Sequence, residues 1–292
     1  MNQIFKRINK EKTSYLFLLP TLIIYMLFFI YPLIQGFYYS FCEYHGKSFV
    51  YVGTKNYLYF LQDKIFRRVL LNTCWLSIIV VPTILIFSIL IANYIVRKKQ
   101  IIRGVLMGIF YFPGITSIVT ICIAWKWLYN SNGILNYFLN LLRIEGTNWL
   151  GNPNTALVSV AIVLIYICVG MPIVLLTSAI GNIPHSFYEV ADIEGATSWQ
   201  KLIYITLPLI KPTVFYLVVI LTISAFRAFI FIMLLSGGGP YYSSSVIASY
   251  LADVAFTFSQ FGKAATIGII LLVITSALTL IQYRFFKGDV EY

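Results

Sequence analysis

The sequence predicts an all-α integral membrane protein with six transmembrane helices and both termini in the cytoplasm. Sixty per cent of its 292 residues are hydrophobic and 11% are charged, which leaves too little polar surface to cover a water-soluble globule. Six apolar runs approach or exceed the length that a helix needs to cross the hydrocarbon core of a bilayer. Basic residues are more frequent in the connecting segments on one side of these runs.

The six runs are predicted to be helical because a backbone in lipid must satisfy its own hydrogen bonds. They contain no Asp or Glu, and Arg227 is their one cation. The first run follows a basic tail, as in a signal peptide, but it is longer than a signal-peptide core and lacks a clear small-x-small cleavage site. We therefore expect it to be retained. The predicted spans are residues 14–40, 74–96, 105–125, 155–180, 213–235 and 264–283.

The orientation follows from the positive-inside rule, because short cytoplasmic segments retain Lys and Arg. The N-terminal tail and the hairpin 97–103 are both strongly basic. With the tail inside, the inner segments hold twelve of the 21 Lys and Arg residues and the outer segments hold eight. The net charge of +11 then indicates topology and contact with anionic lipid. No basic patch interleaved with aromatic residues predicts nucleic-acid binding.

Motifs for catalysis, nucleotide binding or metal binding are missing from the sequence. Cys42 and His45 are close, but two ligands do not make a zinc site. The segment HGKS at 45–48 lacks the earlier glycine of a phosphate-binding loop, since that position is Phe41. We expect neither an enzyme nor a metal site, and no disulfide is suggested by the four dispersed cysteines: Cys42, Cys74, Cys122 and Cys168.

A half-polar segment, residues 181–212, separates the fourth and fifth runs and is the largest predicted cytoplasmic loop. An amphipathic helix is predicted to start near Pro184, with Phe187, Val190 and Ala191 on one face. Gly195 and Ala196 then permit a sharp elbow. A second short helix is predicted to end before Pro208, and Pro212 stiffens the start of the next span.

The loop resembles the "EAA" signature, E-A-A-x3-G-x9-I-x-L-P, of permease subunits of binding-protein-dependent ABC importers. The first alanine of the signature is Val190 here. The matching residues are Glu189, Ala191, Gly195, Ile205, Leu207 and Pro208. Segments such as LLPTLIIYMLFFIYPLIQGFYYSF, NWLGNPNTAL and SGGGP extend the resemblance along nearly the whole chain, to the maltose, multiple-sugar and glycerol-phosphate branch of that family.

This resemblance implies a type I ABC importer permease fold in a bacterial cell membrane. It implies that 181–212 is a coupling helix that fits a groove on a cytoplasmic ATPase, with Glu189 against a basic residue and Gly195 at the bend. The implied partners are a second permease subunit, two ATPase subunits that hold ATP and Mg²⁺, and an extracytoplasmic binding protein. The alternative is a solvated linker with no partner.

Candidate substrate-path residues are Arg227, Ser224, Tyr166 and Trp127, because a cation within a span tends to face a cavity or a partner and aromatic rings stack on sugars. Trp125 and Tyr129 offer further rings. Arg227 suits an oligosaccharide with a carboxylate, although a structural role against helix carbonyls or a partner subunit is the alternative. Aromatic residues also form membrane belts. A six-helix secondary carrier or channel is the rival function.

Overall fold

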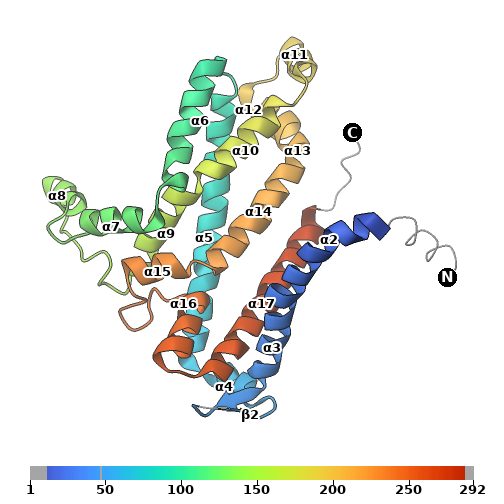
Figure 1. The fold of residues 1–292 in the computed structure, drawn as a ribbon. Helices are drawn as coiled ribbons and strands as arrows, with labels where there is room; N and C mark the ends of the chain where they lie inside the picture. Colours follow the sequence, from blue (N-terminus) through green and yellow to red (C-terminus); the bar gives the residue numbers. More distant parts are fainter. Residues whose placement is uncertain (1–11, 47, 287–292) are drawn as a thin grey trace. The chain divides into compact units, whose positions relative to one another are not determined.

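The computed structural model describes residues 12–46 and 48–286, which form two compact units (Figure 1). Unit 1 comprises the described residues up to 60 and Leu251–Ile270, and unit 2 comprises Leu61–Tyr250 and residues 271–286. Three described helices are long and apolar enough to cross a membrane, and up to six spans result if each of three bent helix pairs is one span. The predicted runs at 14–40, 74–96 and 264–283 overlap the three long helices, and those at 105–125 and 155–180 overlap two of the bent pairs. The run at 213–235 overlaps the third pair only as far as residue 226.

Unit 1 begins with one apolar helical run and continues into a small hairpin. Its elements are α2 (Lys12–Tyr25), η1 (Met26–Ile30), α3 (Tyr31–Ser40), β1 (Cys42–Tyr44), β2 (Phe49–Tyr51), α4 (Lys55–Gln62), η3 (Asp253–Thr257) and the first part of α17 (Phe261–Phe286). The strands are antiparallel, with Glu43 opposite Val50. The apolar side chains of the first run, such as Phe17, Phe28 and Phe29, are exposed, as expected for a helix whose sides face lipid or a partner.

Buried polar side chains satisfy the backbone where the first helix of unit 1 ends. The Asn56 amide donates to the carbonyls of Ser40 and Cys42 at 3.1 and 2.8 Å, and the Thr266 hydroxyl donates to that of Ser40 at 2.9 Å. Gly262 lies so close to this turn that a Cβ atom would be 1.9 Å from the Cys42 carbonyl oxygen. The start of α17 is therefore packed backbone to backbone against the turn.

Unit 2 is a bundle around α5 (Lys64–Ile95), against which α9, α10 and α14 pack (Figure 1). The Asp63 side chain caps α5 by accepting a hydrogen bond from the amide of Ile65 at 2.9 Å. Buried Leu76, Ile84 and Leu176 belong to the apolar core. The other elements are α6 (Gln100–Ile115), α7 (Ile118–Leu128), α8 (Ile134–Leu141), α9 (Ala156–Cys168), α10 (Gly170–Gly181), α11 (His185–Ile193), α12 (Ser198–Lys201), η2 (Leu202–Thr206), α13 (Leu207–Leu209), α14 (Lys211–Phe226), α15 (Phe229–Leu235) and α16 (Ile247–Ala252), which ends in unit 1.

Three predicted spans differ from the structure. The run predicted at 155–180 bends by 43° between α9 and α10, and the helices of the other two break. The run predicted at 105–125 bends by 91° between α6 and α7, where Thr116 has an extended backbone and its hydroxyl bonds to the carbonyl of Phe112. The run predicted at 213–235 stops at Phe226 and resumes at Phe229. Neither proline nor glycine marks this second break, so we attribute it to packing of α15 against α7 and α9.

The predicted end of the second loop helix before Pro208 is wrong, because the helix continues to Leu209. A π turn precedes the proline: the amide of Leu207 bonds to the carbonyl of Leu202, five residues back. This wide turn accommodates the proline ring, which would clash with a carbonyl in a regular α-helix. The helix then bends by 74° at Ile210, where α14 begins with Pro212 in its first turn.

The loop after α15 is fixed to the first half of α5. The Asn72 side-chain amide lies 2.9 to 3.1 Å from the carbonyl oxygens of Tyr242, Ser243 and Ser245. The neighbouring Thr73 hydroxyl accepts a hydrogen bond from the amide of Ile247 at 2.9 Å. The loop therefore has a defined conformation, although it joins two helices.

Candidate coupling site

The elbow of residues 184–209 begins with α11 and turns at Gly195. The helix starts at His185, directly after Pro184, and ends in a Schellman motif. The amide of Gly195 bonds to the carbonyl of Asp192, and that of Ala196 bonds to the carbonyl of Ala191 at 2.8 Å. Gly195 has a φ of +75°, which glycine adopts at little cost. The predicted bend is therefore present at this glycine.

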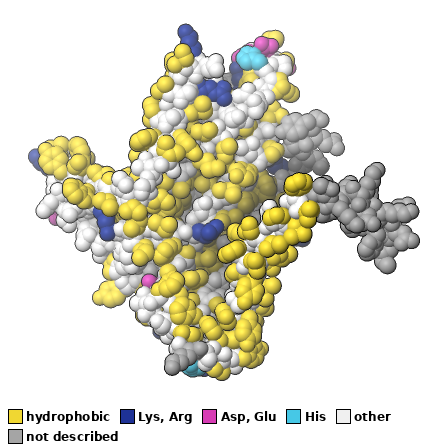
Figure 2. Space-filling model, viewed as in Figure 1, with side chains coloured by type: hydrophobic (Ala, Val, Ile, Leu, Met, Phe, Trp, Pro, Cys, Tyr) yellow, Lys and Arg dark blue, Asp and Glu magenta, His cyan; other side chains and the backbone are white. Residues whose placement is uncertain are grey.

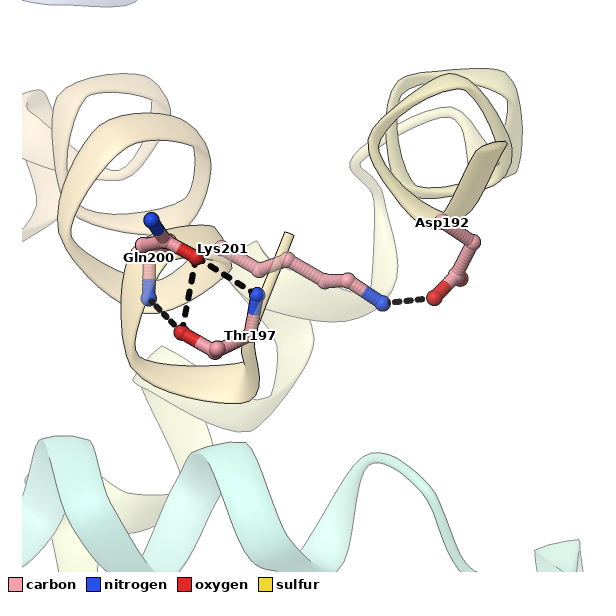
Figure 3. Close-up of polar contacts among 4 residues, drawn as sticks. All are labelled: Asp192, Thr197, Gln200 and Lys201. Atoms are coloured by element: carbon pink, nitrogen blue, oxygen red, sulfur yellow. Dashed lines mark hydrogen bonds and ion pairs between the residues drawn. The ribbon is translucent and has the colours of Figure 1, made fainter. Parts of the chain in front are cut away.

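The second helix of the elbow is started by a capping box (Figure 3). The Thr197 hydroxyl accepts a hydrogen bond from the amide of Gln200, and the Gln200 side-chain oxygen accepts one from the amide of Thr197 at 2.7 Å. Together these bonds satisfy two amides that a helix start leaves unpaired. Thr197, two residues after Gly195, is thus the N-cap of a new helix.

Two side-chain contacts join the helices of the elbow. Lys201 extends from α12 toward α11 and forms an ion pair with Asp192 (Figure 3). The hydroxyls of Tyr188 and Thr206 are hydrogen-bonded at 2.9 Å. The Lys201 side chain is only 15% exposed, whereas that of Asp192 is 64% exposed. These contacts fix the angle between α11 and the helix that leads through α13 to α14.

The elbow exposes large apolar side chains next to charged ones. Phe187 and Val190 on α11 are 50% and 57% exposed, and Ile193 is 86% exposed. Trp199 on α12 is also exposed. Figure 2 shows acidic and histidine side chains gathered over α11, which carries His185, Glu189 and Asp192. An exposed apolar surface rimmed by polar groups is typical of a protein-binding site.

The signature residues occupy different environments within the elbow. The carboxylate of Glu189 is exposed and lies 2.9 Å from Nδ1 of His185, one helical turn earlier. Ala191 and Ala196 belong to the Schellman motif. Ile205 is half-buried in the π turn, and Leu207 packs against the core of unit 2. The signature thus comprises an exposed charge, a turn and a partly buried leucine that packs on the core, and Pro208 follows this leucine.

The substrate-path candidates are not brought together in the structure. Arg227 is exposed at the break between α14 and α15. Within the described residues, no side-chain hydrogen bond, ion pair or cation–π contact joins it to Trp127 or Tyr166. The side chain of Ser224, one helical turn before Arg227, is also exposed. The structural alternative for Arg227 was a bond to helix carbonyls or a contact with the partner subunit. No such carbonyl bond is present among the described residues, and the contact with a partner subunit stays a prediction.

The aromatic candidates separate into buried and exposed rings. Tyr129 is 3% exposed and its hydroxyl donates to the carbonyl of Ser159 at 3.0 Å, so it belongs to the core. Trp125 stacks edge-on against Tyr166 with ring centroids 5.6 Å apart, which leaves Tyr166 half-exposed. Trp127 is 77% exposed and lines a cavity of about 380 Å³. Trp127 and Tyr166 therefore remain accessible candidates.

Sequence reasoning missed the residues that hold the elbow together. The capping box was readable as Thr197 and Gln200 at the T-x-x-Q spacing that precedes a helix. The pair of Asp192 and Lys201 was not readable, since nine residues and a turn separate them and no helical spacing relates them. In the part of the chain that the structure describes, no group of His, Cys, Asp or Glu could hold a metal ion.

Comparison with known proteins places this geometry in a family. Residues 62–288 match the model of the binding-protein-dependent transport system inner membrane component. The chain is 32% identical to YurN of Bacillus subtilis (strain 168), a probable ABC transporter permease protein, with 97% of this chain and 99% of that protein covered. It is 28% identical to AraP of the same strain, an arabinooligosaccharides transport system permease protein, with 96% and 91% covered.

The fold is also similar to that of a solved transporter chain. A bacterial alginate ABC transporter, crystallised in complex with its alginate pentasaccharide-bound periplasmic protein, contains a chain with a TM-score of 0.86 and 26% sequence identity. The match covers 99% of this chain and all of that chain. The family model and the full-length relatives agree, and they exclude the rival assignment to a secondary carrier or channel. This chain belongs to the binding-protein-dependent transport system inner membrane components, and it is a multi-pass membrane permease of the ABC transporter type.

Proposed function

We propose that this chain is a membrane-spanning subunit of an ATP-driven importer for oligosaccharides, including acidic ones. Its termini and the elbow of 184–209 face the cytoplasm. The elbow contacts an ATPase subunit that holds ATP and Mg²⁺, and a second permease subunit completes the path. An extracytoplasmic binding protein delivers the solute. This chain forms part of the translocation path and transmits the movement of the ATPase to it, and the partner ATPase hydrolyses ATP.

The observation that carries the proposal is the stiffened elbow. A loop without a partner gains nothing from exposed Phe187, Val190 and Ile193, whose apolar surface is costly in water. The ion pair of Asp192 with Lys201 and the bond of Tyr188 to Thr206 hold this surface at a fixed angle. A push on α11 is therefore transmitted through η2 and α13 to the span α14. Such a transmission suits a rigid-body transition between inward-open and outward-open states.

An association assay tests the docking surface directly. Val190→Glu places a charge within the apolar face of α11 and should abolish co-purification of the cognate ATPase subunit. Lys99→Glu introduces the same side chain at an exposed residue outside the elbow and should leave co-purification intact. Equal retention of the ATPase by both variants would remove the docking role of α11.

The cargo is proposed from Arg227 and from the relatives. AraP is a permease for arabinooligosaccharides, and alginate is an acidic polysaccharide. Arg227 presents an exposed guanidinium at a helix break of this chain, and no acidic side chain of the described residues pairs with it. A guanidinium binds a carboxylate through two parallel hydrogen bonds. We therefore assign Arg227 to a carboxylate of the cargo, with Tyr166 and Trp127 available for its sugar rings.

A further inference from the structure

A cavity of about 420 Å³ lies within unit 2, between the elbow and the end of the bundle. Its walls come from the end of α5 and the turn after it, the start of α6, the end of α10, and the facing sides of α11 and α12. A cavity of this volume is within the range of small-molecule sites. On α11 the residues that line the cavity include Tyr188 and Asp192 but not the exposed apolar residues Phe187, Val190 and Ile193. It is therefore distinct from the exposed apolar surface of the elbow.

The charge in this cavity is strongly unbalanced. Three cations line it, Arg97, Arg103 and Lys201, and one carboxylate, that of Asp192. Asp192 is already paired with Lys201. Within the described residues, the Arg97 side chain has no ion pair. Two guanidinium groups therefore remain without a counter-charge in a space that also offers Asn93 and the Tyr188 ring.

The guanidinium of Arg103 is held in place before any ligand arrives. One of its nitrogens donates to the carbonyl of Thr177 in the last turns of α10 at 3.2 Å. Its two terminal nitrogens lie 2.9 and 3.1 Å from where a Cβ of Gly181 would be, so this glycine leaves the room that the guanidinium occupies. Among residues 12–46 and 48–286, which the structure describes, the other N–H groups of Arg103 make no hydrogen bond or ion pair and can bind an oxyanion. A pre-positioned donor loses little entropy on binding.

We propose that this cavity binds a phosphate-bearing anion, whose oxygens bridge Arg97 and Arg103 and so tie the α5–α6 hairpin to the elbow. Paired guanidinium groups recognise phosphate through charge-assisted, bidentate hydrogen bonds. The volume exceeds that of a lone phosphate, so it accommodates a phosphate monoester or the diester headgroup of an anionic lipid. The placement of the cavity at the cytoplasmic face rests on the proposed function, but its charge and shape do not.

Protection of an engineered cysteine tests the site in the assembled importer. In a chain whose four native cysteines are replaced by serine, Asn93→Cys lines the cavity and Ser186→Cys lies outside it. Two probes separate the sources of phosphate: glucose 6-phosphate added to phosphatidylcholine nanodiscs, and phosphatidylglycerol built into the nanodiscs. A probe at ten times its Kd should slow maleimide labelling of Asn93→Cys about tenfold and leave Ser186→Cys unchanged.

Variants of the arginines decide whether the protection comes from this cavity. Arg97→Gln should abolish it, and Arg103→Lys, which keeps the charge but not the fork, should weaken it. Lys99→Gln removes the same charge from an exposed neighbour that does not line the cavity and should keep the protection. Protection by either probe supports the site and identifies the source. No protection by either, or equal protection in Arg97→Gln, overturns it. Labelling does not require transport, so the result is independent of whether the elbow couples to an ATPase.

Discussion

Lys201 and Asp192 form an ion pair across the turn at Gly195, and their exposure is unequal. The lysine side chain is 15% exposed and lines the same cavity as Arg97 and Arg103, whereas the aspartate is 64% exposed. Removal of the aspartate therefore leaves a largely buried cation next to two others. Removal of the lysine leaves a carboxylate that water can solvate. We therefore expect removal of the aspartate and removal of the lysine to change the stability of the permease by different amounts.

We predict that Asp192→Asn destabilises the permease more than Lys201→Met does. An unpaired buried charge is costly, and the two neighbouring guanidinium groups add repulsion. Lys201→Met keeps the apolar stem and removes one of the crowded cations. The coupling energy of the pair should be about 1 kcal/mol, because the aspartate is exposed. Thermal unfolding of the two variants and of the double variant measures both quantities.

The matched control for this cycle is Lys211→Met, which removes a lysine from the same part of the chain at a site without an ion pair in the described residues. Its melting temperature should stay near that of the wild type. Equal destabilisation by Asp192→Asn and Lys201→Met would mean that the charge of the cavity has no influence on the elbow.

We predict that Gly195→Leu leaves the protein inserted in the membrane and abolishes transport. No atom lies within 4 Å of where a Cβ would be, so the defect comes from the backbone alone. A φ of +75° costs a residue with a side chain about 1–2 kcal/mol, and leucine relieves this cost by opening the turn. Gly195→Asn tolerates the left-handed conformation better and should retain most uptake. Normal uptake by Gly195→Leu would remove the coupling role of the elbow.

The apolar runs and the signature predicted the helical fold and the location of the elbow, but not its fixed angle. Hydropathy reports the length of a run and not its straightness, so the breaks at Thr116 and Arg227 were missed. Pro208 was expected to end a helix because proline clashes with a regular turn. A π turn removes that clash, and nothing in the local sequence reveals it.

The substrate path was less predictable than the elbow because it depends on contacts between distant helices. Tyr129 resembled a candidate ring in the sequence, yet its hydroxyl is bonded within the core. Arg103 belongs to no motif that the sequence shows. It lies 74 residues from Thr177, whose carbonyl accepts a hydrogen bond from the Arg103 guanidinium and so positions it. Such pairs are set by how helices cross, which a single sequence does not encode locally.

We predict that Gly170→Ala disrupts the crossing of α6 and α10. A Cβ at this position would lie 2.2 Å from the carbonyl oxygen of Phe110, so the helix backbones must separate. Forced separation of a packed core costs about 1–3 kcal/mol. Gly104→Ala, in α6, meets no atom within 4 Å and should be neutral or slightly stabilising, since alanine favours the helix. Melting temperatures of the two variants in detergent compare these effects, and equal values would contradict the close crossing.

We predict that Lys98 and Lys99 face the cytoplasm and that residues 148–154 face the outside. Single cysteines at position 99 and at Asn152 can be introduced after replacement of the native cysteines. Both sites lie in turns between helices, so neither substitution should disturb a span. An impermeant maleimide applied to intact cells should label the Asn152→Cys variant only, and the Lys99→Cys variant should react after the cells are opened. Labelling of position 99 in intact cells would reverse the orientation.

The final prediction concerns the cargo and depends on Arg227. If its guanidinium binds a carboxylate of the transported sugar, Arg227→Gln should lower uptake of an acidic oligosaccharide about tenfold or more, since a lost charge-assisted hydrogen bond costs about 1.5–3 kcal/mol. Uptake of the neutral analogue of the same length should change little. Arg227→Lys keeps the charge without the bidentate fork. Its uptake of the acidic oligosaccharide should be intermediate between that of the wild type and that of Arg227→Gln. Assays of both sugars in proteoliposomes with the cognate binding protein separate cargo recognition from assembly. Equal loss for both sugars, with normal ATPase association, would assign Arg227 to contact with the partner permease instead.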